Sequence, residues 1–250
     1  MIISFFTKSG RGRSFHLSKK FIHNAIILHK NKDMEISTQY RLSPEQYRQQ
    51  RTDKKQIVIH HTVSGPGVTG DVGWWNSTPE RVGTAYVIDR DGTIYNLFDD
   101  EYWACHLGLS SKHFQAAHLP YRNLDSESVA IELDNWGPVE ADPGTGVFYP
   151  KGKIRKAKPV KYVYEYCYNE RWKGHTLWEA YTTAQLQALG QLLKYLCEKY
   201  NIPKTYNREM WTVSAAALKG SPGIWSHCSY RNDKSDCHPQ HELIKTIREL

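Results

Sequence analysis

The sequence has no apolar run long enough to cross a membrane and no recognisable export signal. About 20 consecutive apolar residues are needed to span a bilayer. The stretch FIHNAIILHK at residues 21–30 is shorter and is interrupted by His23 and Asn24. In the N-terminal MIISFFTKSGRGRSF the apolar residues precede the basic ones and no small-residue cleavage site follows, which is not the order of a secretion signal. We therefore expect neither a membrane span nor Sec-dependent export.

Cysteine is too scarce for a disulfide framework. The five cysteines are an odd number, and no two of them have CxxC spacing. A chain of 250 residues with 40% hydrophobic residues can form its core without disulfides. No internal repeat is visible, so the length predicts one or two globular domains. At least one cysteine then has a role other than pairing.

Acidic residues are scarce at the N-terminus. Residues 1–55 hold 12 Lys and Arg but 4 Asp and Glu, whereas the remaining residues hold 21 and 22. We interpret residues 1–54 as a basic extension and residues 55–250 as the main folded domain, with Met34 as an alternative start. Such an extension can meet nucleic acid, acidic lipid or an anionic cell-wall polymer, or remain a solvated arm.

The remaining pattern predicts an α/β fold, in which a central mixed β-sheet is flanked by α-helices. The expected elements are a helix at 43–51, a strand at 56–62, a loop at 63–76, a hairpin at 81–98, a strand at 126–137 and a helix at 181–203. Thr182 and Gln185 form a capping box at the start of the last helix. Residues 138–180 are expected to be a rim insertion, in which residues 146–166 form a β-hairpin. Within it, six cations and no acid lie between Lys151 and Lys161.

Two apolar segments end in histidine. The run QIVIHH ends in His60 and His61, and the run GIWSH ends in His227. Cys237 follows in the polar loop KSDCHP, where a thiol is poorly suited to core packing. Two imidazoles and a thiolate are three protein donors for Zn²⁺ and leave its fourth position to water. From the residues alone, an alternative to a metal site remains. One histidine of the His60-His61 pair then caps the strand and the other faces water, and His227 and Cys237 are unrelated polar residues.

Taken in order, several segments resemble the zinc-dependent N-acetylmuramoyl-L-alanine amidases of the amidase_2 type, which include phage endolysins and are related to the peptidoglycan recognition proteins. These segments are IVIHHT, VGTAYVIDRDGTIYNL, WACHLG, VAIELDNWG, YTTAQLQALGQLLKYLCEKYNIP and WSHCSYRNDKSDCHP, and they cover residues 55–245. The resemblance implies an amidase-like fold, a Zn²⁺ cofactor, and peptidoglycan or muropeptides as partners. It implies that a zinc-activated water cleaves the amide between the lactyl group of N-acetylmuramic acid and L-alanine. A non-catalytic module that only binds peptidoglycan is the alternative.

The resemblance implies that the protein acts on the bacterial cell wall, which it would reach as a phage lysin or on a virion. A recycling enzyme of the same type would instead act in the cytoplasm. No specific nucleic acid partner is expected.

The resemblance also implies which residues hold the metal. The first histidine of the strand-end pair and the closing segment give His60, His227 and Cys237 as ligands. Cys-His-Pro replaces the commoner Cys-Pro-Gly of the family, which makes Asp236 and His238 rival ligands. Cys237 is preferred because the family has a ligand there and thiolate binds zinc well.

The catalytic residues follow from the same resemblance. Glu132 on the acidic strand corresponds to the family's acid/base residue. The residue two before the last ligand contacts the developing oxyanion; here it is Ser235, with Lys234 one position earlier. Thr84 stands where some members have a catalytic tyrosine.

Three further residues are candidates for substrate contact. His106 in WACHLG is expected to donate to the substrate carbonyl or to hold the substrate, with a structural role as the alternative. Trp74 and Trp75, in the expected Gly-rich loop, could stack on sugar or wall a peptide groove, and buried packing is the alternative. His61 alternates to the opposite strand face from His60, so we expect it to be structural or to support the ligands.

Overall fold

The computed structural model describes residues 34–154, 156–167 and 170–250. Most of the predicted basic extension therefore lies outside the described residues. Residues Glu35–Leu250 form one compact unit. Strand β1 (Ile36–Ser37) pairs with β4 (Ile94–Asn96) of the central sheet, so the folded body includes residues ahead of the predicted boundary at 55.

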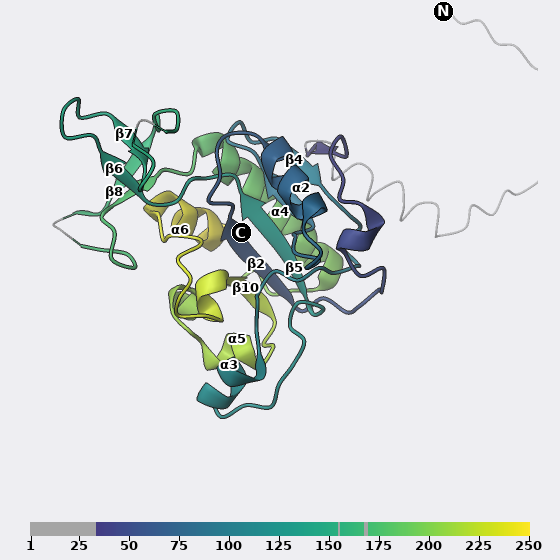
Figure 1. Cartoon of the computed structure of the whole chain (residues 1–250). Coiled ribbons are helices and arrows are strands. Elements are labelled where there is room, and N and C mark those ends of the chain that lie inside the picture. The colour runs from purple at the N-terminus through teal and green to yellow at the C-terminus, as the bar shows by residue number, and fades with distance from the viewer. Residues whose placement is uncertain (1–33, 155, 168–169) are drawn as a thin grey trace, which may run out of the picture. The chain divides into compact units, whose positions relative to one another are not determined.

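A six-stranded sheet in the order β1-β4-β3-β5-β2-β10 forms the centre of this unit (Figure 1). Its other strands are β3 (Tyr86–Ile88), β5 (Ser128–Leu133), β2 (Gln56–His61) and β10 (Gly223–Ser226). β3 and β4 are antiparallel, as the Asp91-Gly92 turn predicts, and the other neighbours are parallel. The predicted mixed α/β fold is confirmed.

The middle strands owe their apolar sequence to cover on both faces. All six residues of β2 are buried, and so are five of the six residues of β5. Parallel strands covered on both faces typically read as continuous apolar runs. Helix α4 (Thr183–Tyr200) runs behind the strands in Figure 1 and contributes a buried leucine face.

Helix α4 begins and ends as the sequence predicts. The Thr182 hydroxyl accepts from the Gln185 amide at 3.0 Å, and the Gln185 side chain accepts from the Thr182 amide at 3.1 Å. At the other end Asn201 adopts a left-handed conformation with φ of 54°. Reciprocal capping and a left-handed cap satisfy backbone groups that have no partner inside the helix.

Two expectations about helices are wrong. The stretch expected to be a loop contains helix α2 (Val68–Ser77), and the helix expected at 43–51 is a single 3-10 turn, η1 (Pro44–Gln46). The remaining helical elements are α3 (Ser111–Ala116), η3 (Arg208–Trp211), α5 (Ala215–Leu218), η4 (His227–Ser229) and α6 (His241–Arg248). Within the described residues, no helix combines the length and apolar character needed to cross a membrane.

The insertion forms two small sheets rather than one hairpin. β6 (Val139–Ala141) pairs with β7 (Phe148–Pro150), and β8 (Val163–Glu165) pairs with β9 (Leu177–Glu179). The expected hairpin over residues 146–166 is therefore wrong.

A buried ion-pair network fastens the insertion to the body. The Arg90 guanidinium, next to the β3–β4 turn, donates to Glu179 at 2.8 and 2.7 Å and pairs with Asp134 at 2.5 Å. Asp134 directly follows β5, and Glu179 is the last residue of β9. The network thus joins the end of the insertion to the same end of the central sheet at which β5 stops.

Candidate active site

Three polar residues form a row across the carboxyl ends of adjacent parallel strands. His60 on β2 is the register partner of Glu132 on β5. His227 comes directly after Ser226, which is paired with Ile59, so it occupies the position beside His60 on the third strand. Register partners on neighbouring strands point to the same face of a sheet. The sheet therefore brings these three side chains together, and for His60 and His227 their position at the ends of apolar runs predicts this.

Asp236 completes a cluster with the two histidines. His60 Nδ1 lies 3.1 Å from His227 Nδ1 and 3.0 Å from Asp236 Oδ2, and His227 Nδ1 lies 2.9 Å from the same oxygen. All three residues are buried. Although burial raises the pKa of Asp236, His227 and His60 hold it well below its usual range, so the group is a carboxylate.

Hydrogen bonds behind His60 fix its tautomer. Ser128 Oγ donates to the Leu124 carbonyl at 2.7 Å, so it accepts from His106 Nε2 at 2.8 Å. His106 Nδ1 then carries no proton and accepts from His60 Nε2 at 3.0 Å. A neutral imidazole has one N–H and one lone pair. His60 Nδ1 therefore presents a lone pair to the cluster, and burial, which lowers the pKa of His60 to about 4, keeps the ring neutral.

The tautomer of His227 is fixed in the same way. Its Nε2 lies 3.0 Å from the Leu107 carbonyl, which can only accept. Nε2 therefore carries the proton, and Nδ1 presents its lone pair to His60 and Asp236. Three lone pairs, one of them on a charged oxygen, thus converge on one point.

This arrangement fits a divalent metal ion. Three converging acceptors without a proton between them repel each other, and a cation at their centre removes the repulsion. With bonds of about 2.0–2.2 Å, tetrahedral zinc holds its ligand atoms about 3.3–3.6 Å apart, slightly wider than the spacing seen here. Each histidine gives its second nitrogen to a hydrogen bond within the chain, as metal-bound histidines do. Among the described residues, this is the one group of three or more His, Cys, Asp or Glu side chains whose ligand atoms are spaced closely enough to hold a metal ion.

Cys237 does not join this cluster. Its side chain is fully buried, and burial, followed by the neighbouring Cys228, raises the pKa of its thiol well above the usual value. The structure thus brings together two of the three expected ligands, and the rival Asp236 occupies the third place. The other rival, His238, is stacked 4.4 Å from the ring centre of Tyr181 on another side of the loop.

Glu132 has the environment of an acid/base group. Its Oε2 atom is buried and has no hydrogen-bond partner among the residues that the structure describes. Burial, followed by the charges of Asp236 and Asp71, raises the pKa of Glu132 well above its usual value. A carboxyl group with a raised pKa, next to a metal cluster, is suited to accept a proton and return it.

The sequence matches the profile of the Amidase_2 family, described as N-acetylmuramoyl-L-alanine amidase, over residues 50–239. The chain belongs to this amidase family. The match includes every residue of the cluster and Glu132. Family membership assigns this amidase to the enzymes that act on peptidoglycan.

Solved structures with a similar fold include further amidases. A structure of PlyL is 13% identical with a TM-score of 0.48, over 86% of this chain and 98% of that one. The endolysin amidase LysCS from Clostridium intestinale is 15% identical with a TM-score of 0.41, over 86% and 93%. The amidase AmiD from E. coli, in complex with anhydro-N-acetylmuramic acid-L-Ala-D-gamma-Glu-L-Lys, is 17% identical with a TM-score of 0.44, over 80% and 60%. No curated protein sequence matches this amidase.

His106 lies behind His60 rather than in open space. Its side chain is 4% exposed, and both of its ring nitrogens are engaged, with His60 and with Ser128. These contacts favour a role in orienting His60 over the predicted contact with substrate. His61 lies on the opposite strand face, as expected, where its Nδ1 is 2.9 Å from the Tyr181 hydroxyl.

The other predicted substrate contacts are distributed unevenly. Thr84 is buried and donates to the Tyr86 carbonyl at 3.0 Å. Trp74 and Trp75 lie on α2, where Trp74 is 58% exposed and Trp75 is buried. Trp74 is therefore the one of these three residues whose side chain is open to a ligand.

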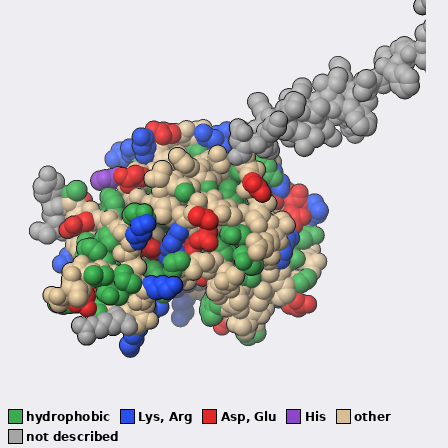
Figure 2. All heavy atoms as spheres, turned by 90° about the horizontal axis from the view of Figure 1, so that it is seen from above, with side chains coloured by type: hydrophobic (Ala, Val, Ile, Leu, Met, Phe, Trp, Pro, Cys, Tyr) green, Lys and Arg blue, Asp and Glu red, His purple; other side chains and the backbone are tan. Residues whose placement is uncertain are grey.

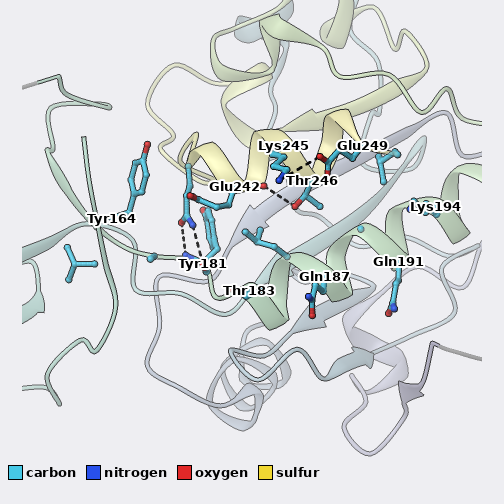
Figure 3. Close-up of a pocket in the computed structure, with 16 residues that line it drawn as sticks. Tyr164, Tyr181, Thr183, Gln187, Gln191, Lys194, Glu242, Lys245, Thr246 and Glu249 are labelled. Atoms are coloured by element: carbon cyan, nitrogen blue, oxygen red, sulfur yellow. Dashed lines mark hydrogen bonds and ion pairs between the residues drawn. The ribbon is translucent and has the colours of Figure 1, made fainter. Parts of the chain in front are cut away.

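A groove between α4 and α6 lies apart from these residues (Figure 3). Its volume is about 790 Å³. It is lined by Gln187, Gln191 and Lys194 of α4, by Lys245 of α6 and by Glu249, which directly follows α6. None of the predicted catalytic or metal-binding residues lines this groove. Its mixed charges and amides give no sign of a reaction centre.

Asp71 is a carboxyl group near the site that the sequence pattern did not reveal. It lies on the buried face of α2, and its Oδ2 has no hydrogen-bond partner in the described part of the chain. Burial, partly offset by Ser64, raises the pKa of Asp71 to about 7. The signal available in the sequence was an acid inside an apolar pattern, Val68, Asp71, Val72 and Trp75, which repeats at helical spacing.

Asp71→Asn should raise the stability of the protein at pH 8 but not at pH 4. The folded protein holds the Asp71 carboxyl at a higher pKa than the unfolded chain, so stability is lost as pH rises from about 4 to about 7. Asparagine does not ionise and avoids this loss. A shift of about three units at about 1.4 kcal/mol per unit limits the gain at pH 8 to about 4 kcal/mol. Urea unfolding at both pH values measures it, with the exposed Asp53→Asn as control; equal gains at pH 4 and pH 8 would contradict the burial of an ionised Asp71.

Proposed function

We propose that the protein hydrolyses the amide between the lactyl group of N-acetylmuramic acid and L-alanine, with zinc held by His60, His227 and Asp236. The observation that carries the proposal is the convergence of three lone pairs beside the unpartnered carboxyl of Glu132. When bound, zinc supplies a Lewis acid that lowers the pKa of water toward about 7 and polarises a carbonyl oxygen.

The residues around the cluster have separate tasks in this proposal. Glu132 accepts the proton of the attacking water and delivers it to the nitrogen of the leaving L-alanine, because an amine leaves an amide readily only once it is protonated. His106 holds the ring of His60 with its lone pair toward the cluster. Because the side chains of Glu132 and His106 are buried, bulk water is excluded around them and the local electrostatic interactions are stronger.

Lys234 supplies positive charge for the developing oxyanion. With Asp236 as the third ligand, Lys234 stands two positions before it, which is the place of the family's oxyanion contact. Its ammonium is close enough to lower the pKa of both His60 and Glu132, as a smaller effect than burial. Ser235, the alternative, uses its carbonyl to accept from Trp172 Nε1 at 3.4 Å.

Mass spectrometry of digested cell wall tests the proposed function. Purified peptidoglycan should yield stem peptides with a free N-terminal L-alanine and glycan strands without peptide. A chelator should abolish these products, and added zinc should restore them. Binding of peptidoglycan without such products, in zinc-replete protein, would refute the hydrolysis. The same substrate places the action of the protein on the bacterial cell wall or on its soluble fragments.

A further inference from the structure

The insertion carries four exposed lysines, three of which line a groove of about 680 Å³. We define the lysine strip as Lys153, Lys156, Lys158 and Lys161. All four side chains are exposed. Within the described ranges, none of the four forms an ion pair with a carboxylate. Figure 2 shows Lys and Arg side chains on the face above β6–β8, next to hydrophobic side chains.

The groove has a net positive lining. Of the described residues that line it, Arg90, Lys156, Lys158 and Lys161 are cationic, and Asp91 and Glu179 are acidic. Arg90 and Glu179 bind each other. The lysines are therefore left with one acid in the groove, Asp91, which also accepts from the Thr93 amide at 2.8 Å.

The groove lies near the metal cluster. Gly65 lines it and follows His60 by five residues, so their Cα atoms are at most about 18 Å apart. Trp136 also lines it and follows Glu132 by four residues, which limits that distance to about 14 Å. The Trp136 ring packs on Gly65, since a Cβ there would lie 3.0 Å from Trp136 Cζ2. A polymer joined to the substrate therefore needs to extend only a few sugar or peptide units to reach the strip.

The type of cation indicates the type of anion. A single carboxylate is best bound by the two-pronged guanidinium of arginine, and Arg90 is already occupied by Glu179 and Asp134. Lysines act as separate point charges and suit phosphates spaced along a chain. Among the described residues, none of the four lysines of the strip is paired with a carboxylate. The strip thus matches a polymer of repeated phosphates better than it matches the free carboxylates of a short peptide.

The aromatic groups distinguish between polymers with and without bases. Lys153 Nζ lies 4.3 Å from the ring centre of Trp136, and Lys161 Nζ lies 4.9 Å from that of Tyr162. Proteins that bind single-stranded nucleic acid offer open aromatic faces on which bases stack. Here a lysine occupies a face of each ring, which places charge rather than a stacking platform at the surface.

We propose that the lysine strip and its groove bind a phosphodiester-linked polyol polymer of the kind attached to bacterial peptidoglycan. The inference rests on the proposed function, since it assumes that the neighbouring site acts on the wall. The strip then holds the protein on polymer-bearing wall close to the bond that it cleaves.

Binding of a synthetic glycerol-phosphate oligomer to the full chain tests this proposal. We expect Lys153→Gln/Lys156→Gln/Lys158→Gln/Lys161→Gln to bind at least about tenfold more weakly than the wild type at moderate salt. The slope of log affinity against log salt should fall by about 3, because each lost phosphate contact removes about 0.7 for a single-stranded polyanion. The matched control exchanges four exposed lysines elsewhere, Lys112, Lys194, Lys219 and Lys245, for glutamine. Both variants keep the basic residues before Met34, so the comparison isolates the strip.

Three results would overturn the proposal. The strip variant could bind the oligomer as well as the wild type, or the control could lose as much affinity. An oligodeoxythymidylate of equal charge could also bind as tightly through the strip, which would assign it to nucleic acid. Equal urea midpoints show that the variants fold, and Lys156→Gln/Lys158→Gln replaces the fourfold variant if it does not. Digestion of polymer-free wall by the wild type tests amide hydrolysis separately.

Discussion

Asp236→Asn should cost the protein its bound zinc and its hydrolytic activity, whereas Cys237→Ser should cost it neither. Asp236 Oδ2 lies within 3.0 Å of both histidine nitrogens, so its loss removes one of three donors. Loss of even an outer partner of a ligand typically weakens metal binding by 10–100-fold, so we expect at least about 100-fold here. Turnover should fall by about 10³ or more, since the Lewis acid contributes several kcal/mol to the transition state.

Zinc content after gel filtration and zinc competition with a chelating dye measure the affinities. The two substitutions affect adjacent positions, and each new side chain is close in size to the one that it replaces. Each variant therefore serves as the control for the other. Cys237 is completely buried, and Cys237→Ser is expected to reduce stability modestly while the metal stays bound. If Cys237→Ser released the zinc and Asp236→Asn retained it, the third ligand would be the thiolate and the cluster would rearrange on binding.

The choice between these neighbours shows what the sequence could not supply. The positions of His60 and His227 were predictable because apolar runs stop at these histidines and parallel strands end at one edge of a sheet. Glu132 was found through the family resemblance. The third donor comes from a loop without regular structure. In this loop a shift of one position exchanges a carboxylate for a thiol. Backbone angles decide this, and the residue types KSDCHP do not.

Helix α2 was missed for a different reason. Gly70 and Gly73 lower the intrinsic helix propensity by about 1 kcal/mol each relative to alanine and suggest a loop. Packing outweighs this cost, because Val68, Val72 and Trp75 bury one face of the helix. The capped helix α4 was predicted correctly, since its local signals and its apolar face agree.

The insertion was predicted only as a region. Strands β7 and β8 were recognised as β-rich, but each pairs with a segment outside the expected hairpin, β6 and β9. Strand pairing depends on contacts between residues distant in sequence, which periodicity does not encode. The anchoring of Glu179 by Arg90 is a contact of this kind.

Glu132→Gln should lower kcat by about 10²–10⁴-fold while zinc content stays that of the wild type. Glutamine has nearly the shape of glutamate but cannot accept the proton of the attacking water or return it to the leaving amine. Because Glu132 does not provide any of the three converging ligand atoms, metal binding should not depend on it. The measurements are steady-state kinetics on a soluble muropeptide and zinc analysis of the same sample.

Stability separates this catalytic role from a structural one. The buried Oε2 of Glu132 has no hydrogen-bond partner in the described structure, so the carboxyl contributes little to folding and is costly when charged. Glu132→Gln should therefore be at least as stable as the wild type in thermal unfolding, the usual result when a strained catalytic group is removed. The exposed Glu165→Gln provides the control and should leave kcat unchanged. Unchanged turnover in Glu132→Gln would exclude it as the acid/base group, and loss of zinc or of stability would assign it to the framework of the metal cluster.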